Sequence, residues 1–195
     1  MAGNAALARD SRRDHEVRAL IAKTRDTHAT YSLFSWNVIT PPDAPPHTEW
    51  SAEFNAGFLH RVETPRIRVI ANCKLRSGIL LEVETGRTTE GSEVAATACG
   101  IDGNQPFITA SLLGKAKSKW GTVTNLQIRT AHALRTYAIE LRGIIVAETI
   151  SDPDGQLRLS MKAREIRNWV PRDIFTVGSL QQSFVGNDFR SAPKE

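Results

Sequence analysis

Apolar and polar residues alternate with a period of two from Trp50 to Glu84. The alternation restarts after the turn-forming run Asn55-Ala56-Gly57 and again after Pro65, so it falls into segments of strand length. Alternation that is interrupted at hairpin spacing is typical of an antiparallel meander with one apolar face. We therefore expect consecutive strands here, with an apolar face that the rest of the chain covers.

A period close to 3.6 marks the region that follows residue 13. Val17, Leu20 and Ile21 fall on one face of a helix, and Asp14 is a suitable N-cap. The sequence predicts a helix from residue 14 to about residue 28. The preceding residues are small, polar and basic, and we expect 1–13 to be a disordered N-terminal tail.

The second half of the chain begins with a turn-rich crossing and then returns to strands. Residues 93–99 can form a short helix that Gly100 ends, and Pro106 is expected to open a second helix that reaches Gly114. Alternation resumes after Thr122 and continues to about residue 162. We expect one domain over residues 14–178, followed by a loose, polar C-terminal tail at 179–195.

Composition and charge place the chain among ordinary globular proteins. Its net charge is +4, and its arginines are spread singly along the strands instead of forming one run, so nucleic acid is not an expected partner. No stretch approaches the ~20 apolar residues of a membrane-spanning helix. The N-terminus also lacks the apolar core of a secretion signal.

The sequence contains no motif that names a reaction. It has no glycine-rich nucleotide loop, and its five histidines lack the pairing of metal sites, so neither a cofactor nor a metal is expected. His60 falls on the apolar side of its strand and Glu63 on the other. His60, with Glu63 nearby, is the candidate for a catalytic role, and the alternative is a hydrogen-bonded core histidine. Arg61 and Glu63 are expected to form a surface charge pair.

The aromatic residues leave two interpretations open. Trp36, Trp50, Phe54 and Phe58 share the inward phase of successive strands. They either pack a core under the helices or line a gap between a curved sheet and the helices, where an apolar ligand binds. The two cysteines, Cys73 and Cys99, are not in metal-ligand spacing, and they form either one disulfide or two buried thiols.

The order of the predicted elements resembles the lipoprotein-carrier fold of the LolA type. The common features are a leading helix and strand, a meander with a turn at Thr64-Pro65, an insertion near Gln105–Phe107 and a final stretch at Pro171–Thr176. Residues 58–65, FLHRVETP, resemble the strand before the second turn of that family. The fold also occurs in the LppX and LprG lipid-binding lipoproteins and in VioE of the violacein pathway.

The resemblance implies an α+β fold with a strongly curved antiparallel β-sheet, a half-barrel, covered by the N-terminal helix and a helical insertion. It also implies an apolar cavity that binds a hydrophobic ligand, a lipid or an acyl chain, as a carrier or chaperone does. The residues expected to contact that ligand are Trp36, Trp50, Phe54, Phe58, His60, Val69, Leu81 and Tyr137.

Two other functions are compatible with the same fold. One is a cofactor-free enzyme that acts on a hydrophobic intermediate in the cavity, as in VioE, and the other is an interaction module with a fully packed core. A carrier of this type has a lipoprotein or membrane partner and is periplasmic or secreted if a signal peptide has been removed from the chain, and cytoplasmic otherwise. In an oxidising compartment, a disulfide between Cys73 and Cys99 is expected.

Overall fold

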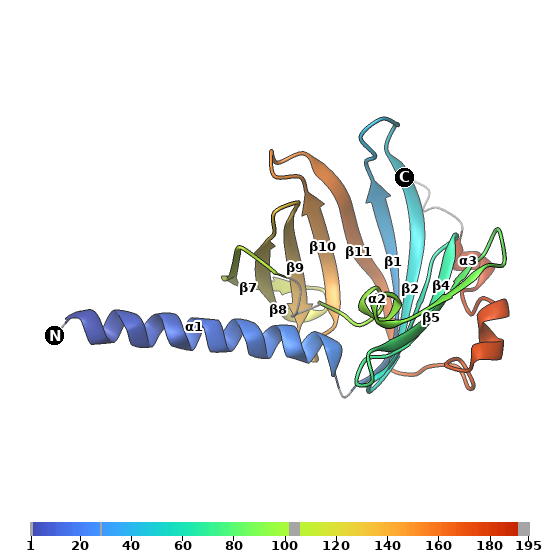
Figure 1. The fold of residues 1–195 in the computed structure, drawn as a ribbon, viewed down its shortest axis with the longest axis horizontal. Helices are drawn as coiled ribbons and strands as arrows, with labels where there is room; N and C mark the ends of the chain where they lie inside the picture. Colours follow the sequence, from blue (N-terminus) through green and yellow to red (C-terminus); the bar gives the residue numbers. More distant parts are fainter. Residues whose placement is uncertain (1, 28, 102–105, 191–195) are drawn as a thin grey trace.

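The alternating segments form one antiparallel sheet of eleven strands, which Figure 1 shows as a deep, open curve. This computed structural model describes residues 2–27, 29–101 and 106–190. The strands follow one another in sequence around the sheet, except that β1 pairs with β11. Their bounds are β1 Thr30–Ile39, β2 His47–Ala56, β3 Leu59–Glu63, β4 Ile67–Asn72, β5 Ser77–Glu82, β6 Thr88–Glu90, β7 Thr109–Ser118, β8 Gly121–Arg129, β9 Leu134–Glu140, β10 Ile145–Ser151 and β11 Leu157–Arg167.

Two helices cover the concave face of this sheet. Helix α1 (Ala2–Arg25) packs Val17 and Ile21 against a cluster that includes Leu126 and Ile139 of β8 and β9. Helix α2 (Ser92–Ala96) packs on β4 and β5. It lies so close to β5 that a Cβ atom added at Gly78 would be 2.9 Å from the backbone nitrogen of Ala95. The predicted α+β half-barrel with a helical insertion is confirmed.

The convex face is covered by the C-terminal segment, defined here as residues 168–190. It contains the 3₁₀ helix η1 (Val177–Gln181) and α3 (Asn187–Arg190), which Figure 1 shows beyond β4 and β5. Ile174 and Val185 are buried against Phe54 and its neighbours in an aromatic cluster. The prediction of a loose tail is therefore wrong for residues 179–190, because apolar residues spaced along the segment bury against the sheet. Residues 191–195 lie outside the described part of the chain.

Two further predictions about local structure differ from the observed elements. Helix α1 begins at Ala2, where a disordered tail was expected up to residue 13. The second helix expected from Pro106 to Gly114 is wrong, because Thr109–Ser118 is the edge strand β7. Ala110 and Leu112 turn towards α1 while Leu113 is 55% exposed, which is the period of a strand. Gln105, part of the same expected insertion, lies outside the described residues.

Candidate ligand-binding site

The curved sheet and α2 enclose an open cavity of about 670 Å³ on the concave side, which we call the trough. Strands far apart in the sheet meet there, since Val62 of β3 and Tyr137 of β9 both line it. Its apolar wall includes Val62, Ala96, Ile145 and Met161. A cavity of this size is within the range that binds small molecules.

One wall of the trough carries a polar group of three side chains, Arg135, Tyr137 and Glu148. The strand register places Tyr137 directly opposite Glu148, and Arg135 precedes Tyr137 by two residues, so all three share one face. A guanidinium nitrogen of Arg135 lies 3.4 Å from a carboxylate oxygen of Glu148. Their side chains are 41% and 19% exposed, respectively, so the pair is open to the trough.

Burial raises the pKa of two of these side chains, Glu148 and Tyr137. Burial raises the pKa of the Glu148 carboxyl, although the charge of Arg135 and a hydrogen bond from Tyr137 oppose the shift. Burial, and then the charge of Glu148, raise the pKa of the Tyr137 hydroxyl to about 12. At neutral pH the Tyr137 hydroxyl is therefore protonated, and it donates its hydrogen bond to Glu148.

A second polar pair lies across the trough. The Tyr31 hydroxyl donates a hydrogen bond of 2.5 Å to Glu53, which lines the cavity. Burial and the neighbouring Glu53 carboxylate raise the pKa of Tyr31 well above its ordinary value. The lining also includes Arg76 and Glu93, so the trough has an apolar wall interrupted by charged residues and is not uniformly apolar.

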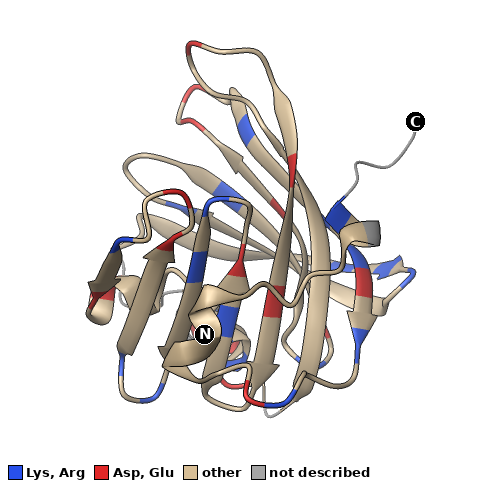
Figure 2. Cartoon of the chain, turned by 90° about the vertical axis from the view of Figure 1, so that its right-hand side faces the viewer, with Lys and Arg blue, Asp and Glu red and all other residues tan. Residues whose placement is uncertain are grey.

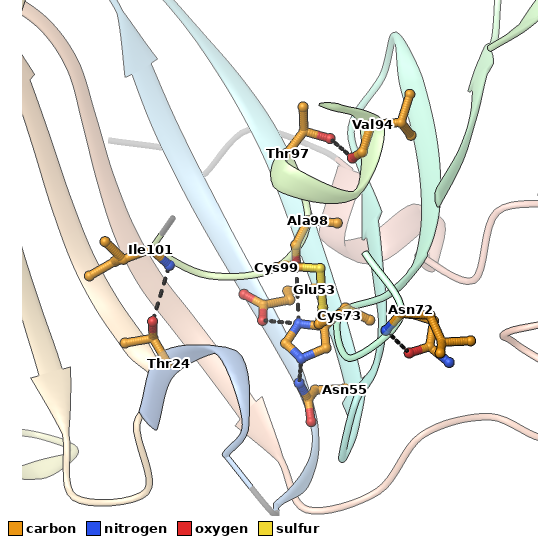
Figure 3. The surroundings of a disulfide bond; sticks show 12 residues. Thr24, Glu53, Asn55, Asn72, Cys73, Val94, Thr97, Ala98, Cys99 and Ile101 are labelled. Carbon is orange, nitrogen blue, oxygen red and sulfur yellow. Dashed lines mark hydrogen bonds and ion pairs between the residues drawn. A yellow bond between two sulfur atoms is a disulfide. The ribbon is translucent and has the colours of Figure 1, made fainter. Parts of the chain in front are cut away.

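The disulfide between Cys73 and Cys99 (Figure 3) anchors the segment after α2, in which Thr97 and Ala98 line the trough. It joins the turn after β4 to the segment that leaves α2. On the far side of Cys99, the backbone nitrogen of Ile101 donates to the Thr24 hydroxyl at 3.0 Å. Gly100 adopts φ +65° there, and a Cβ atom would lie 2.5 Å from the carbonyl oxygen of Thr24. Of the two states left open for the cysteines, the structure therefore has the disulfide.

His60 faces the concave side but is inaccessible to a ligand. Its side chain is 0% exposed, and its ring nitrogens contact the Asn55 amide at 2.5 Å and the carbonyl oxygen of Ala98 at 3.0 Å. The Glu53 carboxylate lies 3.8 Å from the Nδ1 atom of the ring. His60 thus occupies the position of a hydrogen-bonded core histidine that ties β2 and β3 to the segment after α2.

Arg61 and Glu63 lie on the opposite, convex face and are fully buried. Arg61 makes five hydrogen bonds, to Glu63, to the Ser179 hydroxyl and to the carbonyl oxygens of Ile174, Ser179 and Gln182. These use every N–H donor of the guanidinium. The predicted surface charge pair is wrong, because the C-terminal segment covers it. Burial lowers the pKa of Arg61 from its ordinary value, and the Glu63 charge opposes this shift.

The predicted ligand-contacting residues divide between the two faces. Tyr137 lines the trough, whereas Val69 and His60 lie on the concave side as buried residues beneath or beside α2. Trp36, Trp50 and Phe54 pack in the aromatic cluster under the C-terminal segment. Leu81 is also buried and pairs in register with Arg68, which bonds to Leu180 of that segment. Phe58 is in the turn between β2 and β3, with the Lys74 ammonium 5.6 Å from its ring centroid.

The residues that line the trough were mostly missed in the sequence. Arg135 shares its phase with Tyr137, which is a visible signal, but the pairing of Tyr137 with Glu148 depends on strand register. Met161 and Ala96 reach the same cavity only because the sheet bends. The alternation within a single strand specifies neither its register with the neighbouring strand nor the curvature of the sheet.

Charges elsewhere are dispersed. In Figure 2, Lys and Arg lie between Asp and Glu over strands and turns on the side that is shown. Within residues 2–27, 29–101 and 106–190, no group of three or more His, Cys, Asp or Glu has the arrangement of a metal site. Over the same part of the chain, no helix has the length and hydrophobicity needed to span a membrane.

Solved structures with the same fold are known, although no protein-family model and no curated protein matches the sequence. An uncharacterized conserved protein from Thermus thermophilus is 11% identical, with a TM-score of 0.56 over 91% of this chain and 96% of that one. MucB is 11% identical, with a TM-score of 0.51 over 85% of this chain and 64% of MucB. Pseudomonas aeruginosa MucB in complex with MucA has a TM-score of 0.51 at 10% identity, over 86% of this chain and 62% of that one.

A LolA superfamily protein from Nitrosomonas europaea is also similar, with a TM-score of 0.42 and 8% identity over 84% of this chain and 99% of that one. The half-barrel expected from the order of elements is confirmed as a fold by the sheet topology and by the neighbours with TM-scores above 0.5. At these identities the likeness is one of fold alone.

Proposed function

We propose that the chain binds a hydrophobic or amphipathic small molecule in the trough and acts as a carrier. The observation that carries this proposal is the open cavity of about 670 Å³ with an apolar wall on its concave face. Covering apolar ligand surface contributes about 25 cal/mol per Å², so even a short alkyl chain gains affinity there. The polar group on the other wall supports an amphipathic ligand over a purely apolar one.

The two other functions have less support. An interaction module with a fully packed core does not agree with a cavity of this size beside α2. A VioE-like enzyme needs a reactive group that contacts the ligand. His60 is 0% exposed, and Glu63 lies on the other face, so neither candidate catalytic residue reaches the trough.

A fluorescent apolar probe tests the proposal. We expect 1-N-phenylnaphthylamine to bind the protein with an increase in fluorescence. Ala96→Trp should weaken this binding, because Ala96 faces the trough and the indole occupies part of the space that the probe needs. Leu141→Trp is the matched control, since Leu141 is 81% exposed and should leave binding unchanged. Equal binding by both variants, or no binding by the unmodified chain, would contradict the proposal.

The disulfide supports a location in an oxidising compartment, as in the periplasm, where such bonds persist. A lipoprotein or membrane partner is part of the same carrier hypothesis. MucB, which has this fold, was solved in complex with MucA, and that supports a protein partner only at the level of fold. Alkylation of the thiols in freshly lysed cells, with and without reductant, tests the compartment: labelling without reductant would contradict it.

A further inference from the structure

The polar wall of the trough indicates which hydrogen-bonding groups the ligand has, in addition to its apolar part. Arg135 supplies hydrogen-bond donors, and Glu148, which already accepts from Tyr137, has further acceptor positions immediately beside them. The Arg135 guanidinium approaches Glu148 at 3.4 Å through one nitrogen, and 41% of the arginine side chain is exposed, which leaves donors directed into the trough. The wall therefore offers donor and acceptor sites side by side.

The charges around the cavity select against a ligand with a full charge. The trough is lined by the carboxylates Glu53, Glu93 and Glu148 and by the guanidinium groups of Arg76 and Arg135. A ligand anion next to Arg135 would also lie next to Glu148, whose ionised form is already disfavoured by burial. A ligand cation next to Glu148 would face Arg135. Like charges held close together at a partly buried site are costly.

We propose that the ligand is an amphiphile whose polar group is an uncharged amide. Its carbonyl oxygen accepts a hydrogen bond from Arg135, and its N–H donates to Glu148. Its alkyl chain lies along the apolar wall formed by Val62, Ile145 and Met161. This inference rests on the proposed function and specifies the ligand class of the same cavity.

Three probes with the same alkyl chain test the ligand class. Decanamide, decanoate and decylamine are titrated separately into the protein at neutral pH and followed by calorimetry. We expect decanamide to bind about tenfold more tightly than either charged probe, the factor that corresponds to one well-placed hydrogen bond to a charged group. Binding of decanoate or decylamine as tight as that of decanamide would overturn the inference.

Variants of the polar wall test which residues recognise the amide. Arg135→Met keeps the aliphatic stem and should weaken decanamide about tenfold, while Arg66→Met, at an exposed arginine paired with Glu49, should leave it unchanged. Glu148→Gln keeps an acceptor, so it should retain decanamide within about threefold and strengthen decanoate. Unchanged decanamide affinity in Arg135→Met would overturn the inference, with circular dichroism confirming that the variant is folded.

The outcomes separate this inference from the proposed function. If the apolar probe 1-N-phenylnaphthylamine binds while decanamide has no advantage over the charged probes, the amide is wrong and the carrier function stands. If neither the apolar probe nor any decyl probe binds, the carrier function is wrong, and so is the inference that the ligand is an amide.

Discussion

The two faces of the sheet bury polar residues in opposite ways. On the convex face, Arg61 and Glu63 are 0% exposed and fully hydrogen-bonded, and aromatic side chains pack tightly around them. On the concave face, Arg135 and Glu148 are part-exposed and line a cavity. A buried charge with every donor satisfied stabilises the fold, whereas the part-exposed pair beside the cavity is where we propose that the ligand binds.

The largest effect is expected on the convex face, from Arg61→Met. The substitution leaves the Glu63 carboxylate buried without its cation and removes hydrogen bonds to the carbonyl oxygens of Ile174 and Gln182. We expect the free energy of unfolding to fall by about 3–5 kcal/mol. Urea denaturation measures this loss, and Arg66→Met, at an exposed ion pair, should cost less than about 1 kcal/mol. Similar losses in the two variants would show that the buried ion pair on the convex face is no more important for stability than an exposed one.

An intermediate effect separates the apolar residues of the two faces. Phe54 is 1% exposed and packs edge-to-face against Phe34, so Phe54→Ala should cost about 3–5 kcal/mol of unfolding free energy. Met161 borders the trough, and Met161→Ala should cost less, about 1 kcal/mol, because the space beside it is already only partly filled. Thermal unfolding of both variants checks the order. A larger loss in Met161→Ala would mean that the trough is part of the core.

The smallest effect concerns Glu148 and appears as a change with pH. Burial raises the pKa of this carboxyl, so the folded chain binds its proton more tightly than the unfolded chain does. Where the folded state holds more protons, stability decreases as pH rises. The decrease begins near the ordinary value of 4.5 and is complete above the raised pKa of the folded state.

Glu148→Gln should remove this part of the pH dependence and stabilise the protein at neutral pH. Urea denaturation over a series of pH values measures it, with Glu165→Gln, at a carboxylate that is 44% exposed, as the control. If the Glu148→Gln profile runs parallel to that of the unmodified chain, the carboxyl is not held in a desolvated site.

The architecture was predictable because it follows from local patterns. Alternation from Trp50 to Glu84 specifies strands, and the short runs between them allow only antiparallel neighbours. The sequence also placed His60 on the opposite face from Arg61 and Glu63, and the structure has them so. The sequence did not show which face of the sheet each covering helix or segment packs against.

Two interpretations were left open for the inward-facing aromatics, and the structure places Trp50 and Phe54 in a packed core. Phe54 and Trp50 do face a covered interior, but the cover is the C-terminal segment and not a helix of the concave side. The part of that segment after residue 178 looked like a polar tail, because its buried residues, Leu180 and Val185, are widely spaced and follow no period. Alternation fixes two faces of a strand without stating which one is concave.

The most direct test of the central claim is to map where a ligand contacts the protein. Two-dimensional ¹⁵N NMR spectra recorded during a titration with decanamide locate the affected backbone amides. The account predicts that the largest shifts occur at Ala96, Tyr137 and Glu148, around the trough. Shifts centred on Phe54, Arg61 and Phe184 of the convex face would contradict it, as would a titration that leaves the trough residues unchanged.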